Sequence, residues 1–195
     1  QGRLMIWDAA KRSVIRTIDG LGTSVVFTPD GKHVIASSGQ AITMWDVKTG
    51  REVRQFKCDP PGAQYIALAR NGKRLYGVAF PNAESRPGRL HIWNTETSNL
   101  PKTVRAHDDI ICSLAVSPNG ERIATGCIDG TLKVWATKTN RLLWTPSSRR
   151  CPVYTIAFLP DSNQLVSAGN EAFAVWSMDV DREVFSLRGH AGMGL

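Results

Sequence analysis

The chain has 195 residues, of which 42% are hydrophobic and 21% are charged, a composition typical of a soluble globular protein. No apolar run approaches the ~18 residues that cross a membrane, and the first residues lack the apolar core of a signal peptide, so we expect a cytoplasmic protein without membrane spans. The net charge is +7, but the basic residues are scattered rather than gathered into the patch typical of nucleic-acid binders. Nucleic acid is therefore a disfavoured partner, and a basic surface that keeps the protein in solution is favoured over a site for an acidic partner.

The four cysteines, Cys58, Cys112, Cys127 and Cys151, form no Cys-x-x-Cys pair and have no His at zinc spacing. We therefore expect no structural metal, and no motif predicts a cofactor. Cys112 and Cys127 flank a predicted hairpin and could lie opposite each other. A disulfide between them stays open, although reduced thiols that pack as small apolar side chains are the favoured interpretation.

Short runs rich in Val, Ile, Thr and aromatic residues follow one another along the chain, separated by Gly, Pro, Asn and Asp, as is typical of β-strands. The order repeats: one run precedes a turn, a second follows it, a third ends at a tryptophan, and a fourth follows a polar turn. We label these predicted strands a to d. Residues 3–18 predict strands c and d of an incomplete unit, and the units that follow contain the a–b turns TPDGK (28–32), ARNGK (69–73), SPNGE (117–121) and LPDSN (159–163).

The turns and tryptophans keep a regular spacing. The c strands end at Trp7, Trp45, Trp93, Trp135 and Trp176, which lie 38, 48, 42 and 41 residues apart. The longest unit carries an insertion, PNAESRPG (81–88), while its frame stays intact. Pro-Asp-Gly and Pro-Asn-Gly favour tight hairpins, because Pro presets φ and Gly or Asn admits positive φ. Trp144 does not fit this regular tryptophan spacing, and we expect it to pack in strand d or between units.

Four short antiparallel strands in a unit of ~40–45 residues are the pattern of a propeller blade. Through "GCIDGTLKVWA" (126–136) and "WDVKTGREVRQF" (45–56), the chain resembles the WD40 repeat family over nearly its whole length, and its PDGK turns are similar to those of bacterial members. The resemblance implies an all-β fold, a β-propeller of four-stranded antiparallel blades, with about four and a half blades in an open, incomplete ring. The implied divisions of this single partial propeller are 3–18 (part of blade 1), 21–57 (blade 2), 62–105 (blade 3), 107–146 (blade 4), 150–188 (blade 5) and 189–195 (start of a further blade).

The ring implied by the resemblance is larger than this chain. Seven blades, the commonest number in the family, need about 300 residues at ~40–45 residues each. We therefore expect the sequence to be an excerpt of a longer chain whose missing blades complete the ring. Self-association of this chain into a larger ring is the alternative.

The resemblance also implies a buried hydrogen-bond chain in each blade, formed by a His before strand a, a Ser or Thr on strand b, an Asp in the b–c turn and the Trp of strand c. Blade 4 matches at all four positions, with His107, Thr125, Asp129 and Trp135. We interpret this set as a structural network, because a buried carboxylate is stable only when it is hydrogen-bonded. A catalytic triad is rejected, because Thr125 would be a secondary-alcohol nucleophile inside a strand, with no oxyanion-hole loop nearby in sequence.

The other blades depart from this pattern. Blade 2 has Ser37 and Trp45 but no Asp in the b–c turn, and the insertion replaces that turn in blade 3. Blade 5 has Ser167 and Trp176, with Asn170 or Glu171 where Asp is expected. We therefore expect these blades to be held mainly by apolar packing.

Function is expected on loops, which a rigid scaffold presents to partners. In the family, the d–a and b–c loops share the rim that contacts partners. The candidate partner-binding residues on that rim are Asp59, Glu84, Ser85, Arg86, Asp108, Asp109, Ile128, Arg149, Arg150 and Asn170.

The favoured function is a non-catalytic scaffold that binds another protein or a peptide, with no catalytic, cofactor-binding or metal residues. The alternative is a propeller module appended to an enzyme, such as a kinase, protease or electron-transfer domain, outside this segment. A propeller that itself catalyses is disfavoured, because the predicted a strands carry almost no carboxylates.

Overall fold

The computed structural model describes residues 3–19, 22–38, 41–58, 63–79, 86–97, 100–146, 151–169, 172–180 and 182–188. All the regular secondary structure in these ranges is β-strand, which confirms the all-β prediction. No helix among them is long and apolar enough to span a membrane. The chain divides into two compact units, residues 1–80 with 91–102 and residues 81–90 with 103–195. Each unit is described by itself.

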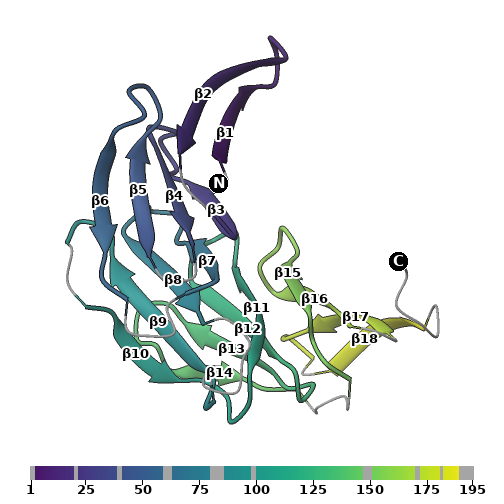
Figure 1. The fold of residues 1–195 in the computed structure, drawn as a ribbon. Coiled ribbons are helices and arrows are strands. Elements are labelled where there is room, and N and C mark those ends of the chain that lie inside the picture. Colours follow the sequence, from purple (N-terminus) through teal and green to yellow (C-terminus); the bar gives the residue numbers. More distant parts are fainter. Residues whose placement is uncertain are drawn as a thin grey trace. The chain divides into compact units, whose positions relative to one another are not determined.

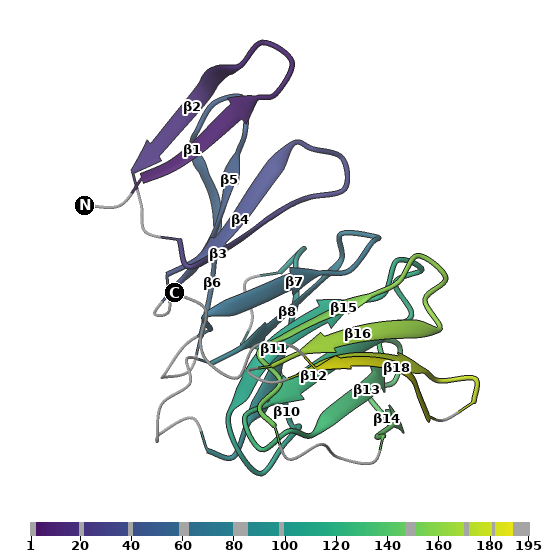
Figure 2. The ribbon, with the colours of Figure 1, turned by 90° about the vertical axis from the view of Figure 1, so that its right-hand side faces the viewer.

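Within the described ranges, eighteen strands form one two-stranded hairpin and four sheets of four strands each. Neighbours in each sheet are neighbours in the chain, so every sheet is a simple meander, and the strands of a sheet lie side by side in Figures 1 and 2. The hairpin contains β1 (Arg3–Asp8) and β2 (Ser13–Asp19). Blade 2 contains β3 (Ser24–Phe27), β4 (His33–Ser37), β5 (Ile42–Asp46) and β6 (Glu52–Phe56).

The remaining three sheets follow the same plan. Blade 3 contains β7 (Tyr65–Leu68), β8 (Arg74–Val78), β9 (Arg89–Asn94) and β10 (Lys102–Arg105). Blade 4 contains β11 (Ile111–Val116), β12 (Arg122–Cys127), β13 (Leu132–Ala136) and β14 (Leu142–Trp144). Blade 5 contains β15 (Thr155–Phe158), β16 (Gln164–Ala168), β17 (Ala172–Ser177) and β18 (Arg182–Arg188). The four sheets are four-stranded antiparallel blades, as predicted, and the hairpin is a two-strand piece of the same pattern.

The a–b turns close in the same way in all four blades. An Asp or Asn side chain accepts a hydrogen bond from the backbone N–H two residues later, at 2.9–3.0 Å. The residue after it adopts a positive φ, which Gly supplies at Gly31, Gly72 and Gly120 and Ser162 supplies in blade 5. These local interactions fix where strand a ends and strand b begins.

A second repeated feature is a register shift between strands c and d, immediately before the Trp. In blade 2, Met44 pairs with Arg54 and Trp45 pairs with Glu52, so Val53 is an extra residue in strand d. Such a bulge bends its strand and re-aims the side chains beside it. The extra residues of the hairpin and of blades 2, 4 and 5 are all apolar and about half exposed: Ile15, Val53, Leu143 and Val184.

Apolar side chains fill the space between consecutive sheets within each unit. In the first unit, one cluster joins Ile35 and Met44 of blade 2 to Leu75 and Trp93 of blade 3, and a smaller cluster joins the hairpin to Val34. In the second unit, a cluster joins blades 4 and 5. Burying a Leu or Ile side chain fully contributes roughly 1.5–3 kcal/mol, so packing between sheets is a large stabilising contribution.

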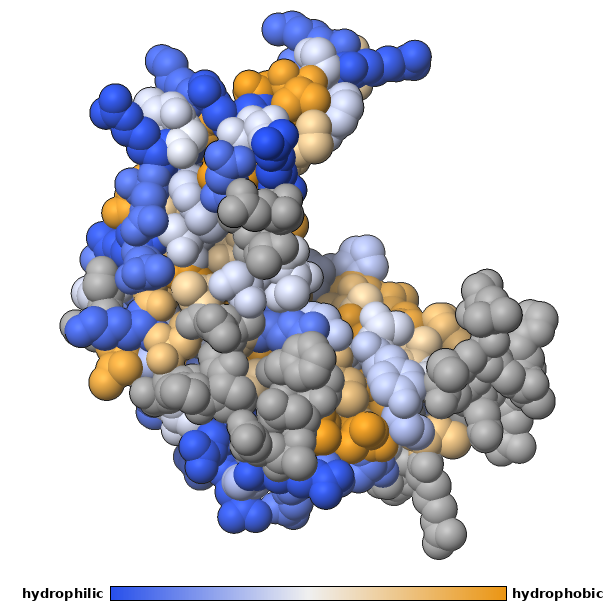
Figure 3. All heavy atoms as spheres, in the orientation of Figure 1, coloured by the Kyte–Doolittle hydropathy of each residue, from blue (hydrophilic) through white to orange (hydrophobic). Residues whose placement is uncertain are grey.

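The two-strand hairpin is only partly buried, with Ile6 and Ile18 packed against Val34. Trp7, at the position of the buried tryptophans, is 57% exposed, and Met5 and Ile15 of the same hairpin are also exposed. Figure 3 shows hydrophobic residues of the hairpin at the surface, near the top of the view, flanked by hydrophilic ones. In blades 2, 4 and 5 a strand b pairs with strand c beside the tryptophan, whereas within its sheet β1 pairs only with β2.

Cys112 and Cys127 are buried thiols that form no disulfide. Cys127 pairs in register with Ile111, so Cys112 is offset by one residue from the position directly opposite Cys127. Burial raises the pKa of both thiols, and that of Cys127 to about 12. The two side chains therefore behave as the small apolar groups that the sequence favoured.

Candidate functional site

A directional hydrogen-bond chain runs through blade 4. The Trp135 indole N–H donates to the Thr125 hydroxyl at 3.0 Å, and that hydroxyl lies 2.8 Å from His107 Nε2. On the other side of the ring, His107 Nδ1 lies 2.8 Å from the Thr131 hydroxyl, which donates to Asp129 Oδ1 at 2.7 Å. The Thr131 hydroxyl donates its proton to the Asp129 carboxylate, so toward His107 it can only accept. His107 must therefore carry its proton on Nδ1, and its Nε2 accepts a hydrogen bond from the Thr125 hydroxyl. Every donor in the chain then has an acceptor.

The four predicted residues therefore lie in one network, but Asp129 reaches His107 only through Thr131. Thr131 was not predicted from the sequence. The available signal was its place two residues after Asp129 in an Asp-Gly-Thr turn, where an Asp side chain commonly accepts from the backbone and a nearby hydroxyl. Both bonds are present, because the Thr131 N–H also donates to Asp129, at 2.8 Å.

The electrostatics of this network keep the imidazole neutral. Burial lowers the pKa of His107 to about 4, and the nearby positive charge of Lys133 adds to this effect. Lys133 is held in place by a 2.8 Å hydrogen bond from its ammonium to the Ala106 carbonyl. Partial burial tends to raise the pKa of Asp129, but hydrogen bonds from Thr131 outweigh it, and the pKa is lowered overall. The network is thus a neutral chain that ends in a carboxylate.

This arrangement offers no reactive nucleophile. The Thr125 side chain is 0% exposed, its oxygen accepts from Trp135, and its proton is directed at His107. A substrate would have to displace the indole and enter a closed sheet interior to reach that oxygen. What the geometry can do is hold strands β12 and β13 against the segment that precedes β11.

The same region contains the one group of described residues whose ligand atoms could hold a metal ion. One ligand atom each from His107, Cys127 and Asp129 lies within 4.8 Å of the other two. Coordination by His107 would break one of its two hydroxyl contacts, and burial holds the Cys127 thiol protonated by raising its pKa to about 12. A metal here would therefore have to dismantle the hydrogen-bond chain.

The buried tryptophans of blades 5 and 3 find different acceptors. The Trp176 N–H donates to Ser167 at 2.8 Å, which reproduces one link of the blade 4 chain. In blade 3 the matching strand b residue is Gly77, and the Trp93 N–H donates instead to the Lys57 carbonyl at 2.7 Å. A Cβ at Gly77 would lie 2.8 Å from the Trp93 ring, so the indole occupies the space that a Ser or Thr would need.

Blade 2 corrects one detail of the sequence analysis. Trp45 pairs with Val34, so the strand b position that matches Thr125 is Ala36 and not Ser37. Ser37 is one residue further along, at the position of Gly126, and its hydroxyl donates to the Gln64 carbonyl at 2.8 Å. The serine therefore ties blade 2 to the segment before blade 3 rather than to its own tryptophan.

Four of the predicted rim residues lie in the described part of the chain, and they gather around the start of blade 4. Arg86 and Asp109 form an ion pair at 2.7 Å, and Arg105 and Asp108 form another at 2.7 Å. Ile128 is half-buried, and its N–H donates to the Ile110 carbonyl. The other six lie outside the described residues: Asp59, Glu84, Ser85, Arg149, Arg150 and Asn170.

A cleft of about 570 Å³ lies between blades 2 and 3, at the ends of the blades where the a–b and c–d turns lie. Its walls are the a–b turns of both blades, the c–d turn of blade 3 and part of β6. Partner contacts were predicted from the sequence on the opposite rim, and this cleft was not predicted. No local motif signals it, because segments about 41 residues apart supply its walls.

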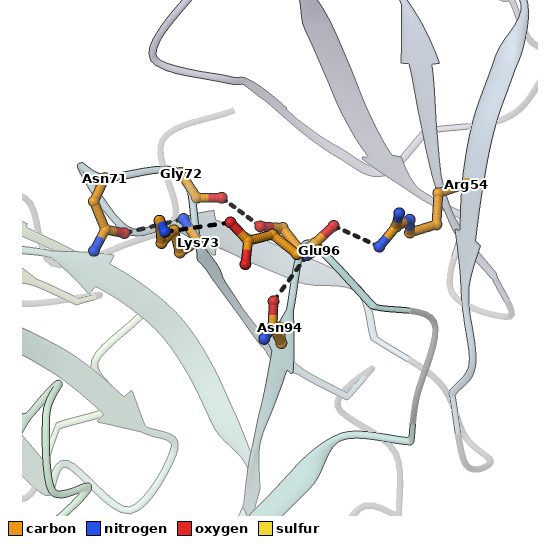
Figure 4. Close-up of polar contacts among 7 residues, drawn as sticks. Arg54, Asn71, Gly72, Lys73, Asn94 and Glu96 are labelled. Carbon is orange, nitrogen blue, oxygen red and sulfur yellow. Dashed lines mark hydrogen bonds and ion pairs between the residues drawn. The ribbon is translucent and has the colours of Figure 1, made fainter.

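The polar groups at the mouth of the cleft are held by short-range contacts (Figure 4). Arg54 reaches from β6 and donates to the Thr95 carbonyl at 2.9 Å. The Thr95 hydroxyl donates to the Gly72 carbonyl at 2.5 Å, and Lys73 forms an ion pair with Glu96 at 3.3 Å. Three backbone segments are thereby fixed around the opening before anything binds.

Comparisons with known proteins agree with the repeated four-stranded sheets. The family model "WD domain, G-beta repeat" matches residues 98–136, a stretch that contains all five members of the blade 4 chain. The chain is 29% identical over 134 residues to U3 small nucleolar RNA-associated protein 12 of Saccharomyces cerevisiae, covering 68% of this chain and 13% of that protein.

Two further relatives extend over more of the chain. An uncharacterized WD repeat-containing protein of Synechocystis is 30% identical over 150 residues, 76% of this chain and 41% of that protein. A CCR4-associated factor 4 homolog of Candida glabrata is 38% identical over 175 residues, 84% of this chain and 28% of that protein. The chain therefore spans less than half the length of each of these three relatives.

Proposed function

Because the chain belongs to the WD40 repeat family, we propose that it is a non-catalytic scaffold that binds other proteins or peptides. The observation that carries the proposal is the closed hydrogen-bond chain of blade 4. Its His, carboxylate and hydroxyl are the groups that would have to perform chemistry, and each is engaged by another member of the chain. A rigid, unreactive core that presents loops is suited to binding.

The proposed binding surface is the rim of d–a and b–c loops, with Asp59, Glu84, Ser85, Arg86, Asp108, Asp109, Ile128, Arg149, Arg150 and Asn170 as its candidate residues. The ion pairs of Arg86 with Asp109 and of Arg105 with Asp108 support this choice. They restrain loop side chains before a partner arrives, and this lowers the entropy cost of binding.

The proposed organisation is a single partial propeller over residues 1–195, with the blade divisions given above, that further blades complete. The exposed Trp7 supports this, since the same position is buried in blades 3, 4 and 5. The missing blades would come from other parts of a longer chain or from a second copy.

Affinity capture with matched charge variants tests the function. The immobilised chain is incubated with a lysate of its source cells, beside an Asp108→Arg variant on the rim and a Glu52→Arg variant on exposed strand β6. We expect a partner that binds the wild type and Glu52→Arg but is lost from Asp108→Arg. Equal capture by all three would contradict the rim. A chemical turnover lost in a folded His107→Gln variant would contradict a non-catalytic role.

A further inference from the structure

The cleft between blades 2 and 3 contains a cation that its surroundings leave uncompensated. Arg54 is half-buried, and its one hydrogen bond across the cleft goes to a neutral carbonyl, that of Thr95. No ion pair joins it to a carboxylate among the described residues, whereas Lys73 at the same opening is paired with Glu96. That bond uses one of the five N–H donors of the guanidinium. A partly desolvated Arg of this kind is suited to a carboxylate ligand.

Apolar surface lies directly beside this cation. Met44 is buried and pairs in register with Arg54, and the bulge in β6 turns the extra residue Val53 toward the same cleft. Val53 is 47% exposed although it is aliphatic. An occupant that places an aliphatic group on Met44 and Val53 and a carboxylate at Arg54 would cover both features.

The shape of the site favours an extended peptide. β6 is the last strand of its sheet, so one side of its backbone has no partner within that sheet. Extended peptides bind such strand edges through backbone hydrogen bonds, with alternate side chains entering neighbouring pockets. A volume of about 570 Å³ falls within the usual range of ligand clefts.

The carboxylates at the cleft argue against a polyanion. Asp30 accepts hydrogen bonds from the Thr28 hydroxyl at 2.6 Å and the Lys32 N–H at 3.0 Å, which lower its pKa and keep it ionised. Glu96 also lies in the lining, where it is paired with Lys73. Closely spaced phosphates would meet repulsion from Asp30, while a single carboxylate can be placed at Arg54.

At the boundary between blades 4 and 5, the residues that correspond to Arg54 and His33 make different contacts. By strand register, Trp144 stands where Arg54 does, and Arg122 stands where His33 does. Trp144 packs edge-on against Trp176 of blade 5, and Arg122 donates to the Ser162 carbonyl at 2.8 Å. Those side chains bridge one blade to the next, as Arg54 does through the Thr95 carbonyl, but Arg54 and His33 also line an open cleft.

We propose that this cleft binds an extended peptide segment of a partner protein, in which an Asp or Glu pairs with Arg54 and an adjacent aliphatic side chain packs on Val53 and Met44. The proposal adds a second, sequence-selective binding surface to the proposed scaffold. It rests on the proposed scaffold function only because it takes the bound molecule to be a segment of a protein. The loop rim lies at the opposite ends of the strands, so the two surfaces can fail separately.

A positional-scanning library of N-acetylated, C-amidated hexapeptides, applied to the full chain, tests the proposal. We expect selection of Asp or Glu at one position and of Val, Ile or Leu next to it. For the best single peptide, Arg54→Gln should raise the Kd at least tenfold, and Arg54→Lys should restore part of the affinity. Arg54→Glu should switch the selected residue from acidic to basic. Arg51→Glu, an equal charge change at an exposed residue outside the cleft lining, should leave the selection unchanged.

Circular dichroism and the urea midpoint of each variant establish that it is folded, and Arg54→Lys supplies a readout if Arg54→Glu is not. Absence of acidic selection, or the same selection by folded Arg54→Glu, would overturn the proposal. Displacement of the selected peptide by single-stranded RNA at equal concentration would also overturn it, because the site would then accept a polyanion. Loss of partner capture by Asp108→Arg with peptide selection intact would leave this site standing and locate the scaffold function on the rim.

Discussion

Blades 4 and 3 bury the same tryptophan in two different ways. In blade 4 the Trp135 N–H donates to a threonine of its own sheet, which continues into the His107 chain. In blade 3 the strand b residue is Gly77, the indole lies over it, and Trp93 donates to the carbonyl of Lys57. A buried N–H must find an acceptor, but the acceptor need not come from the same sheet. The size of one strand b residue decides which solution is used.

The two solutions differ in what they connect. The blade 4 chain joins strands b and c to the segment before strand a of the same blade, so it stiffens one blade. The Trp93 bond joins blade 3 to the end of blade 2, so it adds to the apolar cluster between the two sheets. A polar chain and an inter-blade anchor are therefore alternative ways to fix a blade in this protein.

The largest expected effect comes from breaking the blade 4 chain at its centre. Thr125→Val keeps the side-chain shape but removes the hydroxyl that serves both Trp135 and His107. Two buried polar atoms then lose a partner, and we expect a loss of about 3 kcal/mol in the free energy of unfolding. Urea denaturation measures it, with the exposed Thr139→Val as control. A loss below 1 kcal/mol would show that water or a rearrangement replaces the hydroxyl.

The reverse experiment tries to install the blade 4 solution in blade 3. Gly77→Thr adds a hydroxyl at the right position, but its Cβ would lie 2.8 Å from Trp93 and 3.0 Å from Ala63. We expect destabilisation of about 2–3 kcal/mol from overpacking rather than a gain from a new hydrogen bond. Thermal unfolding followed by tryptophan fluorescence reads the outcome. A stable variant would mean that the two solutions are interchangeable.

Acid should weaken the fold through blade 4. The pKa of His107 is about 4 in the folded protein against 6.5 ordinarily, so between these values the unfolded chain binds more protons. Stability is therefore fully present above pH 6.5 and is lost as the pH falls, by about 2 kcal/mol between pH 7.5 and 5. Urea unfolding at both pH values measures it. His107→Gln should remove most of this difference, and His33→Gln, at a half-buried ring, should retain it.

Blade 5 has only one link of the blade 4 chain, and we expect the loss of that link to lower stability least. Ser167→Ala removes the acceptor of the Trp176 N–H, but no further chain depends on it among the described residues. We expect a loss of about 1 kcal/mol. The urea midpoint of this variant, measured beside Thr125→Val, ranks the two blades. An equal loss in both would mean that the His107 branch adds nothing.

The sequence predicted the fold because short local motifs specify the repeating pattern of strands and turns. The Asp or Asn turns, the Gly of positive φ and the Trp spacing each act within one blade, and together they specify four-stranded units. The members of the blade 4 chain were also accessible, since each occupies a distinct place in that frame. Thr131 was missed because the four-residue pattern has no place for a second hydroxyl, which here links His107 to Asp129.

The remaining features depend on three-dimensional packing. Ser37 was predicted to match Thr125, but the register between β4 and β5 puts Ala36 at that position, one residue earlier. The sequence alone does not distinguish a serine at the matching position from a serine beside it. That Trp93 would use the Lys57 carbonyl depends on how two sheets approach each other. The cleft could not be predicted for the same reason, because Arg54 and Glu96 are brought together only by the packing of consecutive blades.

A double-mutant cycle between Thr125 and Trp135 tests the central claim most directly, that this constellation is a structural chain. Urea denaturation of the wild type, Thr125→Val, Trp135→Phe and the double variant gives the coupling energy. We predict at least 1 kcal/mol, because either single change already breaks the link between the indole and the hydroxyl. Strictly additive losses would contradict the account, since the two residues would then stabilise the blade independently.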